Sequence, residues 1–208
     1  MMSINRRHLI LGTAALALSA GAGLAQSTTI DLTKLSEPSV IGEMALGPET
    51  AKVTLIEYAS ASCPHCAAFY KTAFQDLRKE YIDTGKIRFV FREFPHNQEA
   101  LAAFMLARCV PKEKYFPVVE MFFLQQEQWL PQPATGLFKI AQLAGMTKES
   151  FDACLKNETV AKGIVDVRNL AEQKFGVEGI PTFFLNGKRY EGDNTIESFR
   201  KAIDPLLG

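Results

Sequence analysis

The alternation of apolar and polar residues predicts two strands and a helix in the first half of the chain. Residues 53–59 (VTLIEYA) are β-branched and aromatic, as in a buried strand, and residues 86–94 (KIRFVFREF) repeat this character. Between them, residues 67–81 are apolar at helical spacing, and residues 83–85 (DTG) supply a turn. Strand, helix and strand in this order predict a parallel βαβ unit with a right-handed crossover.

A series of helical patterns follows Pro95. The predicted helices are residues 96–108, 116–129, 135–144, 147–156 and 158–175. Their aromatic and methionine positions recur at helical spacing, which indicates core packing and not a cofactor site. We therefore expect residues 96–176 to form an inserted helical domain.

Strand character returns at the end of the chain. Residues 182–185 and 188–190 flank Asn186-Gly187, a dipeptide that favours a two-residue hairpin. Residues 195–203 then predict a closing helix, with Thr195 as its N-cap.

The predicted fold class is α/β, in two parts separated by the helical insertion. Residues 51–95 form the first part and residues 177–208 the second. Residues 26–50 are weakly patterned, and we expect an extended N-terminal segment there.

Residues 1–25 have the pattern of an export signal. Arg6 and Arg7 form a basic start, residues 9–22 are apolar and small, and residues 23–25 (GLA) offer small side chains for cleavage. The apolar run is short for a membrane span, so an uncleaved anchor is the less favoured alternative. The twin arginine also fits Tat export of a folded protein, and the general Sec route is slightly favoured. We expect a periplasmic protein.

The net charge and the cysteine content limit the classes of function that the chain can have. The formal net charge is 0. Removing the signal also removes Arg6 and Arg7 and no acid, so the mature chain would carry a charge of −2. This balance gives no argument for nucleic acid or an anionic membrane surface as a partner. In an exported protein, the four cysteines are expected to form disulfides.

The tetrad Cys63-Pro64-His65-Cys66 carries the clearest chemistry. It lies between a predicted strand and a predicted helix, with Pro64 in the first helical turn. The helix N-terminus and the His65 imidazole both favour a thiolate at Cys63, while Cys66 is expected to be more buried and to act as the resolving thiol. The alternative is half of a zinc site, which usually needs a second Cys or His pair.

Three other residues are open to more than one interpretation. Glu57 interrupts the first strand, so it is either a buried acid that tunes the cysteine pair or an acid on an exposed strand face. Cys109 and Cys154 fall on different predicted helices. A disulfide between them would close a loop of about 45 residues and stabilise the protein by roughly 3–4 kcal/mol. Two buried free thiols or a second redox couple are the alternatives.

These features together resemble a known family. The CPHC tetrad at a strand–helix junction, the helical insertion, and Gly179-Ile180-Pro181-Thr182 before a ββα end are similar to DsbA-like thiol:disulfide oxidoreductases of the thioredoxin superfamily. The resemblance covers residues 40–205 and implies a thioredoxin fold with an inserted α-helical domain. The best-known enterobacterial members lack a pair that matches Cys109 and Cys154.

The resemblance also implies roles for individual residues. Cys63 would be the attacking and leaving thiol. Pro181 would be a cis-proline facing the disulfide, and the Ile180 backbone would pair with an extended substrate. Glu57 matches a buried acid below the active site, and Arg88 is a candidate for its basic partner.

The function that follows is donation of the Cys63–Cys66 disulfide to exported proteins. Expected partners are newly exported or unfolded proteins that contain cysteines, and a DsbB-like, quinone-linked membrane oxidase. No cofactor or metal is expected, and we expect a monomer. The alternatives are a periplasmic disulfide reductase or isomerase, a thioredoxin-like copper or zinc carrier, and a binding module or chaperone.

Overall fold

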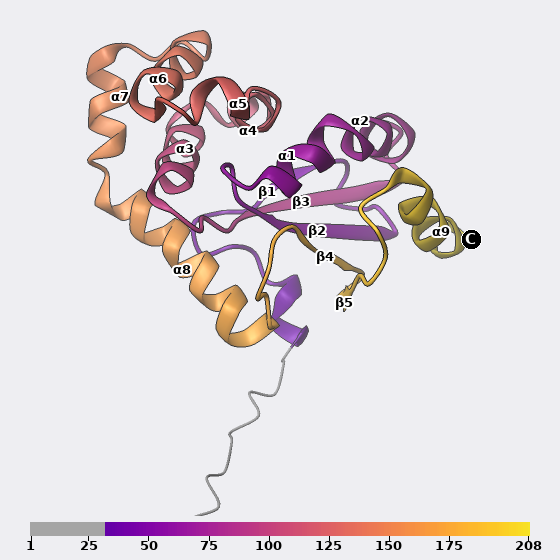
Figure 1. The fold of residues 1–208 in the computed structure, drawn as a ribbon. Coiled ribbons are helices and arrows are strands. Elements are labelled where there is room, and N and C mark those ends of the chain that lie inside the picture. Colours follow the sequence, from indigo (N-terminus) through magenta and orange to yellow (C-terminus); the bar gives the residue numbers. More distant parts are fainter. Residues whose placement is uncertain (1–31) are drawn as a thin grey trace, which may run out of the picture.

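A five-stranded sheet forms the centre of the molecule (Figure 1). The computed structural model describes residues 32–208, so the predicted export signal lies outside the described residues. The strands, in spatial order, are β1 (Met44–Leu46), β3 (Ile87–Glu93), β2 (Val53–Ala59), β4 (Thr182–Leu185) and β5 (Lys188–Arg189). β2 and β3 are parallel, as the predicted βαβ unit requires, and the other pairings are antiparallel.

Helices cover both faces of this sheet and build a lobe beside it (Figure 1). One face is covered by α1 (Pro64–Lys71), α2 (Ala73–Leu77), the π-helical η2 (Arg78–Ile82) and α9 (Ile196–Leu207). The other face is covered by α8 (Glu158–Phe175) and the 3-10 helix η1 (Leu32–Ser36). The lobe contains α3 (Gln98–Cys109), η3 (Lys112–Lys114), α4 (Tyr115–Leu124), α5 (Gln126–Trp129), α6 (Pro133–Leu143) and α7 (Lys148–Leu155). Among residues 32–208, no helix is long and apolar enough to span a bilayer.

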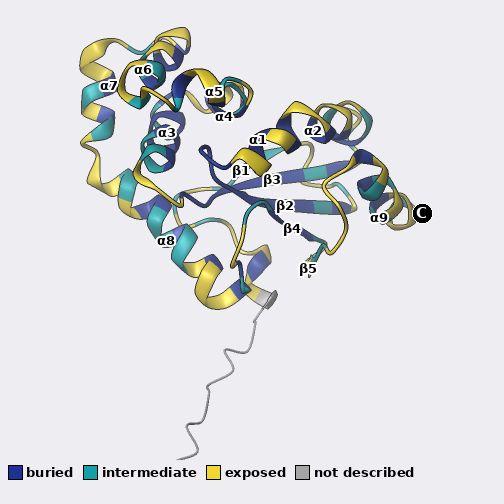
Figure 2. Ribbon diagram, viewed as in Figure 1, coloured by how far each residue is buried: buried dark blue, intermediate teal, exposed yellow. Residues whose placement is uncertain are grey.

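The strand pleat divides the core in two. In β2, Leu55 and Ala59 face the helices α1 and α2, while Ile56 and Tyr58 face α8. The core on the α1 side continues into the helical lobe, where the Tyr70 ring stacks on Phe123 with centroids 4.1 Å apart. Figure 2 shows the resulting buried band through the strands and the inner sides of the helices.

Two predicted helices are each interrupted, and side chains explain both breaks. The helix predicted over residues 67–81 breaks at Thr72, whose hydroxyl donates to the Ala68 carbonyl at 2.8 Å. The helix predicted over residues 116–129 breaks at Gln125. There the Trp129 indole N–H donates to the Phe122 carbonyl at 2.7 Å and replaces a helical bond.

Two other expectations need correction. The N-terminal segment is not simply extended, because η1 and the edge strand β1 fall within it, and β1 pairs Met44 with Phe91. The first helix of the lobe begins at Gln98 and not at His96, since Asn97 is its N-cap and accepts the Ala100 N–H at 2.9 Å. The predicted hairpin at Asn186-Gly187 is confirmed, and both of its residues have positive φ (46° and 78°).

Candidate active site

Cys63 and Cys66 lie where β2 leads into α1. Cys63 is the N-cap of α1 with extended backbone (φ −80°, ψ 123°), and Pro64 is the first helical residue. Both cysteines are free thiols; Cys63 is 6% exposed and Cys66 fully buried. Of the two cysteines, Cys63 is therefore the one that keeps some exposed surface.

The surroundings of Cys63 favour its anion. Its pKa is lowered from the usual 9.0 to about 6, first by a hydrogen bond from the Cys66 thiol. Burial opposes this effect, while the backbone N–H groups of Cys66 and His65 and then the His65 charge support it. The sequence predicted the lowered pKa but assigned it to the helix and the imidazole, and the neighbouring thiol is the larger cause.

Cys66 is affected in the opposite direction. Its pKa is raised well above 9.0 by burial, by its hydrogen bond to Cys63 and by the charges of Glu57 and Cys63. The backbone of Ser60 gives a smaller, opposing hydrogen bond. The pair is therefore asymmetric, with one thiol favoured as an anion and the other as a neutral donor.

Glu57 is buried beneath α1. Burial raises its pKa well above 4.5, against a hydrogen bond from the Tyr70 hydroxyl, and the charge of Cys63 raises it further. The Tyr70 hydroxyl lies 3.1 Å from Oε2, while Oε1 has no hydrogen-bond partner. Glu57 is therefore a buried acid and not an acid on an exposed strand face, which were the two interpretations of the sequence.

Arg88 is not the partner of Glu57, which corrects the expectation from the resemblance. It lies beside Thr54 in the β2–β3 register, whereas Glu57 lies beside Phe91. Successive side chains on a strand point to opposite faces, so Arg88 and Glu57 face different sides of the sheet. Arg88 instead lies 3.4 Å from the exposed carboxylate of Glu49.

The loop before β4 approaches the cysteine pair from another part of the chain. The Ile180–Pro181 peptide bond is cis. The Cys63 thiol donates to the Ile180 carbonyl at 3.6 Å, and the Thr182 hydroxyl donates to the Gly179 carbonyl at 2.6 Å. The fold therefore brings together residues that are more than a hundred positions apart.

Several polar residues next to the cysteines were not predicted from the sequence. The Gln126 side chain donates to the carbonyls of Ala61 and Cys63, at 2.8 and 3.0 Å. The Ser60 carbonyl accepts the Cys63 N–H at 3.0 Å, and the Ser60 hydroxyl lies 2.7 Å from His96 Nδ1. No motif marks these residues, because their contacts depend on loops and helices that meet only in the folded chain.

The second cysteine pair is a disulfide. Cys109 at the end of α3 and Cys154 in α7 are joined with Cα atoms 6.1 Å apart, which is within the usual range for such bonds. It lies in the helical lobe and links α3 to α7 through two cysteines that are 45 positions apart. Among the described residues, no three His, Cys, Asp or Glu side chains gather as a metal-ligand group.

Comparison with known proteins identifies the class to which this fold and site belong. A family model described as Thioredoxin matches residues 39–205, so the chain belongs to the thioredoxin family. The structure has the predicted thioredoxin fold with inserted helices.

Particular relatives place the chain among DsbA-like proteins. It is similar to the crystal structure of Wolbachia pipientis alpha-DsbA1, with a TM-score of 0.75 and 31% identity, covering 80% of this chain and 91% of that one. It is 34% identical to a putative protein-disulfide oxidoreductase of Rickettsia conorii over 79% of this chain, and spans 60% of that relative's length. Disulfide bond formation protein D of Bacillus subtilis is 26% identical over 82% of this chain and 80% of its own.

Proposed function

We propose that this protein is a thiol:disulfide oxidoreductase that donates its Cys63–Cys66 disulfide to exported proteins. The observation that carries the proposal is the opposite shift of the two thiols. A Cys63 pKa of about 6 makes this thiol largely ionised at neutral pH, while Cys66 keeps its proton. Stabilising the reduced pair in this way makes the corresponding disulfide a stronger oxidant.

The reaction begins with the oxidised pair. A substrate thiolate attacks the Cys63 sulfur, the Cys63–Cys66 bond breaks, and Cys66 leaves as a thiolate that takes up a proton. A second substrate thiolate then attacks the substrate sulfur of the mixed disulfide and releases Cys63 as a thiolate. The substrate is oxidised by two electrons, and the enzyme keeps those two electrons as its dithiol.

Glu57 and the loop before β4 have separate roles in this reaction. Burial raises the pKa of Glu57, and its charge acts on Cys66, so Glu57 would be the group that exchanges protons with the resolving thiol. The Ile180 carbonyl accepts a hydrogen bond from the Cys63 thiol, and together with Pro181 it would form one wall of the substrate site. An extended substrate would pair with this backbone as an additional strand.

The setting of the reaction is also part of the proposal. The signal pattern in residues 1–25 supports export to the periplasm, where disulfides persist. A DsbB-like, quinone-linked membrane oxidase would reoxidise the pair, and the enzyme would act as a monomer. The names of the relatives from Rickettsia and Bacillus support the reaction class.

Two measurements test the direction of electron flow. The first equilibrates the Cys63/Cys66 couple with glutathione buffers, and we expect a potential more oxidising than that of glutathione. The second follows oxidation of a reduced, unfolded disulfide protein by the oxidised enzyme, with Cys63→Ser as the inactive control. A strongly reducing potential with no substrate oxidation would favour the reductase. Substrate binding without oxidation, unchanged in Cys63→Ser, would favour a binding module.

A further inference from the structure

One side chain of the helical lobe reaches into the loop that carries the reactive cysteine. Gln126 is the first residue of α5, and it is 6% exposed. Its Nε2 donates to two carbonyls of that loop, Ala61 O at 2.8 Å and Cys63 O at 3.0 Å. A single buried amide therefore spans the turn between β2 and α1.

The carbonyl of Cys63 accepts two hydrogen bonds, and one of them is the bond from Gln126. The other is the first helical bond of α1, from the Ala67 N–H at 3.0 Å. The rotation of the Cys63 backbone (ψ 123°) sets how the sulfur lies relative to the N–H groups at the start of α1. Pro64 contributes no N–H, so the donors available to the sulfur are those of His65 and Cys66.

We propose that Gln126 is a positioning residue, which holds the Cys63 carbonyl so that the backbone N–H groups of α1 point at the Cys63 sulfur. The inference rests on the proposed role of Cys63 as the reactive thiol. It makes the helical lobe part of the redox site, because the amide comes from α5 and its acceptors belong to the thioredoxin fold. Without the amide, the turn can rotate and the N–H groups lose their alignment with the sulfur.

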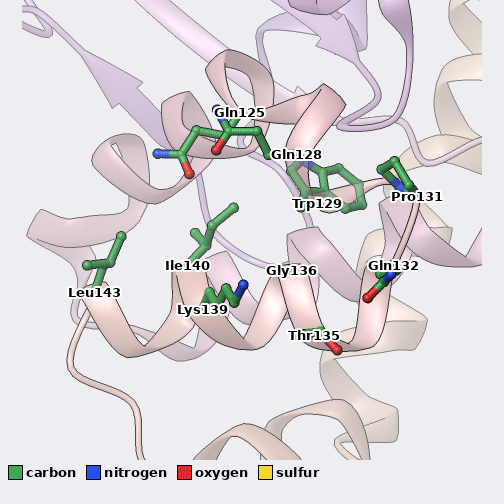
Figure 3. A pocket seen from close by; sticks show the side chains of 10 residues that line it. All are labelled: Gln125, Gln128, Trp129, Pro131, Gln132, Thr135, Gly136, Lys139, Ile140 and Leu143. Carbon is green, nitrogen blue, oxygen red and sulfur yellow. The ribbon is translucent and has the colours of Figure 1, made fainter.

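The rest of α5 supplies a matched control. Gln128 is exposed and lines a cavity of about 310 Å³ between α5 and α6, together with Pro131 and Lys139 (Figure 3). Glu127 forms an exposed ion pair with Lys71 of α1 at 2.8 Å. Neither side chain bonds to the 61–63 loop in the described structure.

The test compares Gln126→Met, which keeps the length but removes the donor, with Gln128→Met on the outer side of the same helix. The readout is the titration of thiolate absorbance in the reduced protein. We expect Gln126→Met to raise the pKa of Cys63 by about one unit and to slow its alkylation near neutral pH by several-fold. Gln128→Met should titrate like the wild type.

A third variant separates positioning from general damage. Gln126→His keeps a ring N–H donor, so its Cys63 pKa should lie between those of Gln126→Met and the wild type. If the role of Gln126 were purely structural, the variants would be less stable but would titrate like the wild type. If Gln126→Met does not fold, Gln126→His is compared with the wild type instead, and we expect a smaller rise in the Cys63 pKa. A folded Gln126→Met, or in its absence Gln126→His, with the wild-type titration would overturn the proposal. These titrations need no oxidase activity, so their result is independent of whether the protein oxidises substrates.

Discussion

Replacing Cys63 by serine should remove a specific pH dependence from the stability of the reduced protein. Folding lowers the pKa of this thiol from 9.0 to about 6. A group whose pKa is lowered by folding stabilises the folded state fully above its unfolded pKa. That stabilisation is lost as the pH falls through the folded pKa.

The size of this effect follows from the two pKa values. The change from 9.0 to about 6 corresponds to about 4 kcal/mol at high pH, where the folded and unfolded thiols are both ionised. At neutral pH it is about 1.4 kcal/mol, because the unfolded thiol is still protonated there, and in mild acid it disappears. Glu57 acts in the opposite direction: its pKa lies above 4.5 in the folded state, so its contribution to stability falls as the pH rises.

The assay is urea unfolding of the reduced wild type and of Cys63→Ser, followed by the fluorescence of the single tryptophan. Subtracting the variant's free energy of unfolding removes the contributions of Glu57 and the other carboxyls to a first approximation. Between about pH 5 and pH 8 the difference should grow by about 2–3 kcal/mol in favour of the wild type. A constant difference over this range would refute the lowered pKa and the mechanism built on it.

Three further predictions concern buried groups. Glu57→Gln should raise the free energy of unfolding at neutral pH by about 1–3 kcal/mol, because an amide replaces a buried acid, and should lower the pKa of Cys66 measured by alkylation. Replacing Cys109 and Cys154 by alanine should destabilise the protein by about 4 kcal/mol in urea unfolding, since a loop of 45 positions is opened. Arg108→Leu should cost about 3–5 kcal/mol in the same assay, because it leaves the Glu93 carboxylate buried without its cation.

Each of these has an outcome that would contradict it. Loss of stability in Glu57→Gln would mean that the bond from Tyr70 outweighs the cost of burying the acid. An unchanged urea midpoint without the second disulfide would show that the unfolded state gains little freedom. For the ion pair, Arg108→Leu combined with Glu93→Gln should recover part of the stability lost in Arg108→Leu alone. No recovery would mean that the loss comes from packing and not from the unpaired carboxylate.

The local elements of the active site were predictable from the sequence because their signals are local. Strand alternation and helical spacing placed Cys63 at a helix N-terminus, and the structure puts it at the N-cap of α1. The last long helix was predicted over residues 158–175, and α8 has these bounds, with Gly176 in the left-handed conformation after it (φ 63°). In both cases, residues within one or two turns of each other carry the signal.

The sequence by itself determined most of the strands and helices, although not η1 and β1, and it determined which cysteine favours the thiolate. The tertiary structure decided which groups surround that sulfur: the buried thiol of Cys66, the carbonyl of Ile180 and, through the loop, the amide of Gln126. It also decided that Glu57, and not Arg88, faces α1. The physical reason is that periodicity records which face of an element is buried, whereas a contact between distant segments depends on how whole elements pack.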